Sequence, residues 1–239
     1  EQEYHGVVRC ALGWACWKTY VGRPEATQIR IGALSLLGNG LSAVKHHEDA
    51  LVAYEAQLPM MRCIGAPEQA MLTVQSCLAN TYAALGRLEK ALRMERDVYS
   101  GRLKLHGEEH GATLLAANNY AISILHLGRF GEAKSLLRKT MPVARRVLGE
   151  NHETALSMGK TYAMALFLDN KATLDDLREA VTTLEDVART ARRVLGGSHP
   201  LTAQFEEALR RSRAALRARE TQPSSDSRDG DLDEVEDVI

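Results

Sequence analysis

Residues 144–149 read Ala-Arg-Arg-Val-Leu-Gly, and the same six residues recur at 191–196. The last residue of the first copy, Gly149, lies 42 residues after Gly107, which lies 42 residues after Gly65. Gly196 follows Gly149 after 47 residues. Agreement at this many positions indicates that the chain is a tandem array of units of about 42 residues.

Apolar residues inside each unit have helical spacing. Ala117, Ala121 and Ile124 fall on one face of a predicted helix, and a second helix is expected after Gly128-Arg129. Small residues recur at one position in each half of the unit. In the first half they are Ala79, Ala121 and Ala163, and in the second half they are Ala50, Ala91, Ala133 and Ala180. A single helix hairpin cannot cover its own apolar face, so the units are predicted to stack into an all-α solenoid.

The repeat also predicts where each unit begins and ends. The Asn39-Gly40 pair predicts a longer turn inside the first complete unit, and residues 171–175 hold the insertion of the last one. An incomplete first unit and the lack of an initial Met predict that the sequence is a fragment. The expected division is 1–22, the second helix of a truncated repeat; 23–65, 66–107, 108–149 and 150–196, complete repeats; 197–219, a capping helix; and 220–239, a disordered acidic tail.

Two prolines lie inside predicted second helices. Pro59 and Pro142 each follow the register alanine, Ala50 or Ala133, by nine residues. A proline inside a helix removes one backbone hydrogen bond and bends the helix. The recurrence at one position favours a kink in a continuous helix, and the alternative is a pair of helices broken at the proline.

Composition excludes several classes of function. The 30 Lys and Arg residues balance 31 Asp and Glu residues, so no net field favours nucleic acid. No apolar stretch is long enough to span a membrane, and we expect no membrane partner. The four cysteines lack CxxC spacing, which favours buried thiols in a reducing compartment. The expected location is therefore cytoplasmic.

One stretch resembles a catalytic motif. Residues 106–110 have the HxxEH pattern of some zinc peptidases. However, His110 aligns with His152 and His199 in the links between units, so we expect it to cap or pack rather than bind metal. No nucleophile motif or phosphate-binding loop is present, and we expect no enzyme activity, no cofactor, no metal and no small-molecule substrate. Trp14 and Trp17 are expected to pack against a neighbouring unit, or else to form an exposed partner site.

Three segments carry a family resemblance: 117–121, 128–133 and 144–152. They resemble the 42-residue tetratricopeptide repeats of kinesin light chains. The resemblance implies a right-handed superhelix whose first helices line a groove that binds a protein or peptide. By position, the groove residues are expected to be Thr73, Ser76, Asn80, Leu115, Asn118, Ile122, His126, Ser157, Lys160, Met164, Phe167, Gln204, Glu207 and Arg211.

The sequence therefore favours a non-catalytic scaffold or adaptor protein. The alternative is the regulatory or substrate-recruiting arm of a larger enzyme or zinc-finger protein whose other domain lies upstream. The acidic tail is opposite in charge to the predicted last helix, which carries Arg210, Arg211 and Arg213. A further hypothesis is that the tail masks the end of the groove, so that deleting 221–239 would tighten ligand binding at low salt, and the alternative is that the tail serves only for solubility.

Overall fold

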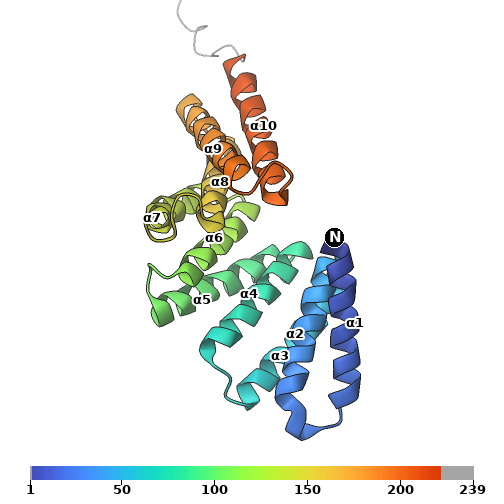
Figure 1. Cartoon of the computed structure of the whole chain (residues 1–239). Coiled ribbons are helices and arrows are strands. Elements are labelled where there is room, and N and C mark those ends of the chain that lie inside the picture. Colours follow the sequence, from blue (N-terminus) through green and yellow to red (C-terminus); the bar gives the residue numbers. More distant parts are fainter. Residues whose placement is uncertain (1, 222–239) are drawn as a thin grey trace, which may run out of the picture.

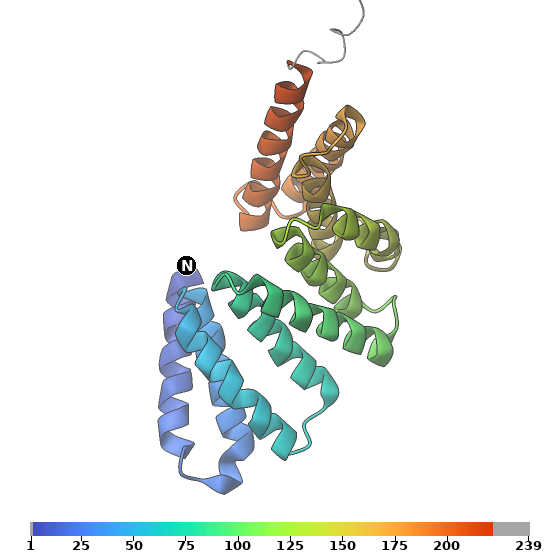
Figure 2. The same ribbon diagram turned by 180° about the vertical axis from the view of Figure 1, so that it is seen from behind.

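The computed structural model describes residues 2–221, which form ten α-helices and one short 3-10 helix, with no strand in that range. The helices follow one another as antiparallel hairpins (Figures 1 and 2). Their bounds are α1 Gln2–Tyr20, η1 Pro24–Ala26, α2 Thr27–Ala43, α3 His47–Cys63, α4 Glu68–Ala84, α5 Leu88–His106, α6 Gly111–His126, α7 Phe130–Leu148, α8 Glu153–Phe167, α9 Leu174–Val194 and α10 Pro200–Glu220. The chain is thus an all-α solenoid, as predicted.

The repeating glycines end helices. Gly107 follows α5 with φ of 81°, and Gly149 follows α7 with φ of 90°. This left-handed backbone conformation strains residues that carry a Cβ atom, which explains why glycine recurs at the link between units. The 42-residue spacing is therefore set by the length of a hairpin plus one glycine-terminated turn.

Each hairpin is buried against the next one. Helices α2 to α9 each contact the helix before and the helix after them, and α8 also contacts α6 and α10. The register alanines Ala50, Ala91, Ala133 and Ala180 are 1 % exposed or less, which lets the helices approach closely. The array bends into an open C, with α5 and α7 on its outer, left-hand side in Figure 1. The open side lies to the right, between α10 and the N-terminal helices.

The expected turn at Asn39-Gly40 is wrong, because α2 continues to Ala43 and the chain turns at Val44–His46, where Lys45 has φ of 65°. Gly40 serves close packing instead. A Cβ atom added there would lie 2.7 Å from the backbone nitrogen of Cys10 on α1. Glycine inside a helix thus lets a neighbouring helix approach closely, and glycine between helices allows a turn.

Both prolines lie inside unbroken helices. Pro59 is within α3 and Pro142 within α7, so the alternative of helices broken at these positions is excluded. Each proline has an exposed position on its helix. The lost backbone hydrogen bond therefore leaves its carbonyl partner near solvent, where water can replace the bond.

Several surface expectations are corrected. All four cysteines are free, but Cys63 is exposed, and the other three are only partly buried, so the expectation of buried thiols is wrong for Cys63. Trp14 is 53 % exposed rather than packed, whereas Trp17 is partly buried. Within residues 2–221, no helix combines the length and the apolarity needed to cross a bilayer. The predicted acidic tail lies outside the described residues from 222 onward, and α10 extends to Glu220.

Candidate functional site: the inner surface of the array

The fourteen predicted groove residues lie on α4, α6, α8 and α10, the first helices of successive hairpins. Twelve of them repeat at three positions of the unit because the helices have equivalent orientations in the stack, and the other two, His126 and Phe167, are the last residues of α6 and α8. We call the first set the upper stripe; it consists of Thr73, Leu115, Ser157 and Gln204. The second set, the central row, consists of Ser76, Asn118, Lys160 and Glu207. The third set, the lower stripe, consists of Asn80, Ile122, Met164 and Arg211.

The first two members of the central row are buried and join one first helix to the next. Ser76 of α4 is 9 % exposed and accepts a hydrogen bond from the Asn119 amide of α6 at 3.4 Å. Asn118 of α6 is 4 % exposed, and its Oδ1 accepts a hydrogen bond from the Thr161 hydroxyl of α8 at 2.9 Å. These two predicted ligand-binding residues therefore connect hairpins, and their side chains are mostly closed to solvent.

A different pair of contacts joins α8 to α10. Lys160 donates to Oε1 of Gln204 at 3.3 Å and lies 5.8 Å from the ring centre of Phe205. Burial lowers the pKa of Lys160 from its ordinary value, because the charged form is less well solvated there. Arg211 lies 5.8 Å above the ring of Phe167, which is itself 8 % exposed. The predicted groove residues of α8 and α10 thus contact one another.

The two stripes are more accessible than the central row, of which only Glu207, at the α10 end, is exposed. Three members of the upper stripe and two of the lower stripe are exposed, namely Thr73, Leu115, Gln204, Asn80 and Arg211. The remaining members, Ser157, Ile122 and Met164, are partly buried, while His126 at the end of α6 is exposed. Residues of the two stripes are seven positions apart, about 10 Å along a helix. The face of α4, α6 and α8 that carries these residues therefore offers two accessible rows on either side of a more buried polar row.

Sequence reasoning missed three residues that organise this surface: Asn119, Thr161 and Glu95. Asn119 and Thr161 lie one position beyond the predicted row, each 43 residues after its partner. Glu95 of α5 is 1 % exposed and accepts a hydrogen bond from Ser76 at 3.2 Å. A search for polar pairs spaced by one unit plus one residue could have found the first two.

The histidines of the links cap helices, as predicted. His110, His152 and His199 precede α6, α8 and α10, and the Nδ1 atom of each accepts a hydrogen bond from the backbone N–H two residues later. The donor–acceptor distances are 3.1, 3.1 and 3.3 Å. His106 and His110 stack with ring centres 4.3 Å apart. Among the described residues, no group of three His, Cys, Asp or Glu side chains is arranged to hold a metal ion.

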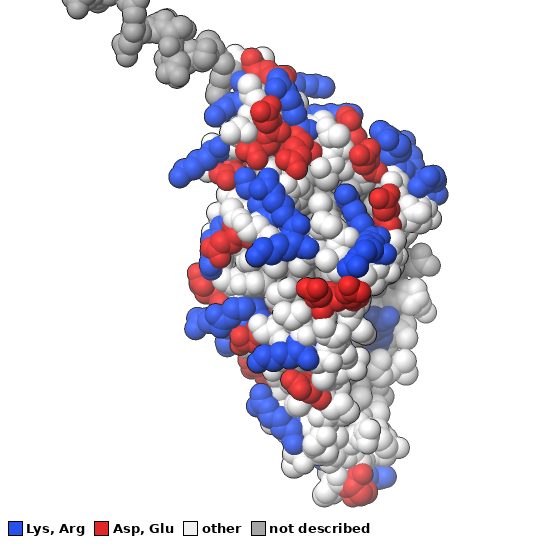
Figure 3. All heavy atoms as spheres, turned by 90° about the vertical axis from the view of Figure 1, so that its left-hand side faces the viewer, with Lys and Arg blue, Asp and Glu red and all other residues white. Residues whose placement is uncertain are grey.

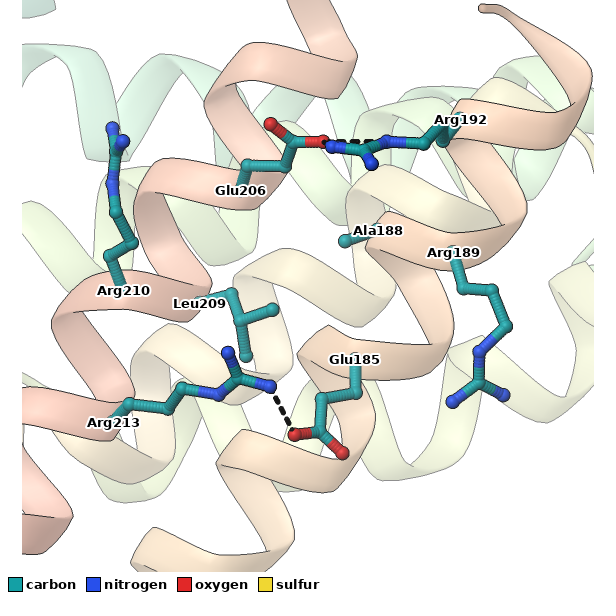
Figure 4. Close-up of a pocket in the computed structure, with 8 residues that line it drawn as sticks. All are labelled: Glu185, Ala188, Arg189, Arg192, Glu206, Leu209, Arg210 and Arg213. Atoms are coloured by element: carbon teal, nitrogen blue, oxygen red, sulfur yellow. Dashed lines mark hydrogen bonds and ion pairs between the residues drawn. The ribbon is translucent and has the colours of Figure 1, made fainter. Parts of the chain in front are cut away.

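A pocket of about 630 Å³ lies away from this surface, between α9 and α10 (Figure 4). Its arginines are already neutralised by carboxylates. Arg213 pairs with Glu185 at 2.6 Å, and Arg192 pairs with Glu206. The other two, Arg189 and Arg210, pair with acidic residues of their own helices. Lysines and arginines are likewise interspersed with acidic residues on the face seen in Figure 3. The pocket is therefore an ion-pair network with balanced charge.

The chain is similar to known tetratricopeptide-repeat proteins in sequence and in fold. Residues 71–112 and 113–154 match the family model for the tetratricopeptide repeat. A putative kinesin light chain of Podosopora anserina with nearly identical TPR-like repeats is 21 % identical, with a TM-score of 0.63 over 80 % of this chain and 89 % of that one. A variant form of the same protein gives 21 % identity and a TM-score of 0.64, covering 80 % and 88 %.

A second solved structure matches over nearly the full length. BtubC (BKLC) from P. vanneervenii is 14 % identical, with a TM-score of 0.59 over 99 % of each chain. No curated protein matches the sequence. Helical repeat arrays of this kind present extended surfaces that serve as protein-interaction scaffolds.

Proposed function

We propose that this tetratricopeptide-repeat protein is a non-catalytic scaffold that binds a peptide segment of a partner protein across its inner surface. The observation that carries the proposal is the pair of accessible stripes at fixed positions of successive first helices. A ligand that crosses the helices meets side chains at equivalent positions of each repeat, which suits an extended or helical segment rather than a small molecule.

The stripes also suggest what kind of peptide fits. Leu115 in the upper stripe is 43 % exposed, and Ile122 and Met164 in the lower stripe are partly exposed. These side chains can accept one or two apolar anchors of a ligand, while the exposed amide of Asn80 can bind a peptide backbone through both its donor and its acceptor. Arg211 places one positive charge at the α10 end of the lower stripe. We therefore expect a mixed apolar and polar peptide.

Peptides selected from a displayed random library on the full chain provide the test. We expect Leu115→Asp and Ile122→Asp to weaken a selected peptide at least tenfold, as measured by fluorescence anisotropy. Leu103→Asp is the matched control, because Leu103 is 38 % exposed on α5, outside the two stripes. Loss of binding in the control with retained binding in the two inner variants would overturn the proposal. Circular dichroism would verify that each variant folds.

A further inference from the structure

Glu95 occupies a position where the other hairpins bury an uncharged side chain. Counting four residues from the register alanines Ala50, Ala91, Ala133 and Ala180 gives a set of equivalent positions. The residues there are Tyr54, Glu95, Leu137 and Leu184, all 3 % exposed or less. A carboxyl group thus lies in the core, at a position that holds leucine in the next two hairpins. Burying an ionised carboxyl is costly unless it is fully paired.

The carboxyl group connects three helices. The Ser76 hydroxyl of α4 donates to Oε1 of Glu95 on α5 at 3.2 Å. The Asn119 amide of α6 donates to the same Ser76 oxygen at 3.4 Å. The other carboxyl oxygen, Oε2, is buried and has no hydrogen-bond partner among residues 2–221. The seam between the α4–α5 hairpin and α6 therefore contains a half-satisfied acid.

The charged and titratable groups around Glu95 do not provide a direct partner. Arg102 on α5 favours the carboxylate through space, but its guanidinium donates to the backbone oxygen of Ala112 at 3.0 Å. Cys77 faces Glu95 from α4 and contacts Tyr54 of α3, while α6 contributes the neutral amide of Asn119. Burial outweighs the Ser76 hydrogen bond and the Arg102 charge, and raises the pKa of Glu95 from 4.5 to about 7.

We propose that the protonation state of Glu95 controls how α4, α5 and α6 pack. The neutral side chain holds the three helices together, and the ionised side chain loosens this seam. The neutral acid leaves one O–H group unpaired, whereas the carboxylate leaves a buried charge with an unpaired oxygen, which favours local opening toward water. The seam carries the N-terminal half of the inner surface, because Thr73 and Asn80 lie on α4 and Leu115 and Ile122 lie on α6. Ionisation would therefore change how these stripe residues are set relative to one another.

The direction of the effect follows from proton linkage. Glu95 keeps its proton in the closed seam up to a higher pH than in an opened one, so closure is favoured at low pH. The benefit is complete below the ordinary pKa of 4.5 and is lost as the pH rises to about 7. While one proton separates the two states, the closed-to-open ratio changes by up to roughly tenfold per pH unit.

Two measurements on the full chain test whether the protonation of Glu95 controls this seam. The first is the ¹³C chemical shift of the Glu95 carboxyl, assigned by its absence in Glu95→Gln, which we expect to titrate near neutral pH. The second is hydrogen-exchange protection of α5, corrected for intrinsic rates, between pH 5.5 and 8.5. We expect protection in the native chain to fall with rising pH relative to Glu95→Gln, with a difference on the order of tenfold by pH 7.5.

Asp97→Asn is the matched control, because the Asp97 side chain lies on the same helix and is 69 % exposed. Its protection profile should run parallel to that of the native chain. A carboxyl that titrates near 4.5, or parallel profiles for the native chain and Glu95→Gln, would overturn the proposal. If Glu95→Gln fails to fold, the carboxyl shift is assigned through its scalar coupling to the Glu95 side chain, and the titration of the native chain decides the matter.

Discussion

The Thr161 hydroxyl donates a hydrogen bond to Oδ1 of Asn118 at 2.9 Å, joining the first helix of one hairpin to the first helix of the next. Thr161 is 1 % exposed and Asn118 is 4 % exposed, so neither group can exchange this partner freely for water. Ser76 and Asn119 make the corresponding link one unit earlier. A polar row thus runs between the two stripes and links the helices that carry them.

Thr161→Val should destabilise the chain by about 1–3 kcal/mol, because the isosteric valine leaves the buried Asn118 oxygen without a donor. Urea unfolding followed by circular dichroism measures the change. Thr182→Val is the control, since the Thr182 side chain is exposed and its hydroxyl donates to the Arg178 carbonyl of its own helix at 3.0 Å. Equal losses in the two variants would show that the link between hairpins adds nothing.

Replacing glycine by alanine should have opposite effects on stability at Gly149 and at Gly131. Gly149→Ala places a Cβ atom on a residue with φ of 90° and should destabilise the chain by about 1 kcal/mol or more. Gly131 lies in the first turn of α7, where an added Cβ atom has no neighbour within 4 Å, so Gly131→Ala should raise stability by up to about 1 kcal/mol.

Thermal unfolding of the two glycine variants beside the native chain measures the sign directly. Because the amino-acid change is the same, differences in side-chain hydrophobicity cancel, and only the backbone conformation differs. A Gly149→Ala chain as stable as the native one would show that the link between units does not require glycine.

The fold was predictable because its determinants are local and periodic. Gly107 and Gly149 mark the ends of equivalent helices, and the register alanines mark where helices touch. Asn39-Gly40 misled the prediction because glycine serves both turns and close helix contacts, and only the position of α1 distinguishes them. That position depends on packing, which a single unit of sequence does not encode.

The candidate site was predictable only as a set of helices. The resemblance to kinesin light chain repeats predicts Ser76 and Asn118 to be groove residues, but their depth depends on how closely the adjacent first helix approaches. Thr161 completes the contact from the next unit, so no pattern within one unit reveals that Asn118 is buried. Glu95 was detectable in principle, since the same register that gives Leu137 and Leu184 gives an acidic residue in α5.

The caps of the first helices allow a separate test. The Nδ1 atom of His152 accepts the Thr154 N–H at 3.1 Å at the beginning of α8. His152→Ala should cost about 1 kcal/mol, and His152→Asp should recover that loss, because a carboxylate both accepts the bond and interacts favourably with the helix N-terminus. Thermal unfolding measures both variants. A His152→Asp chain no more stable than His152→Ala would show that capping is not what His152 contributes.

Glu95→Leu should stabilise the chain, and by more at pH 8 than at pH 5. Leucine is the residue at the equivalent positions 137 and 184, both fully buried. At pH 8 the native chain holds a buried carboxylate whose pKa is raised to about 7, whereas at pH 5 it holds a neutral acid. The gain at pH 8 should be about 1–3 kcal/mol, because removing the buried charge is partly offset by Ser76, which loses its acceptor.

The comparison of the two pH values separates charge from packing in this Glu95→Leu variant. A packing gain is the same at pH 5 and pH 8, whereas the charge contribution decreases as the pH falls below about 7 and disappears only below the ordinary pKa of 4.5. Urea unfolding at both pH values measures the difference, with Asp97→Leu as an exposed control on the same helix. If the stabilisation by Glu95→Leu were independent of pH, Glu95 would titrate in the folded chain as it does in the unfolded chain, and burial could not be what governs its charge in the folded chain.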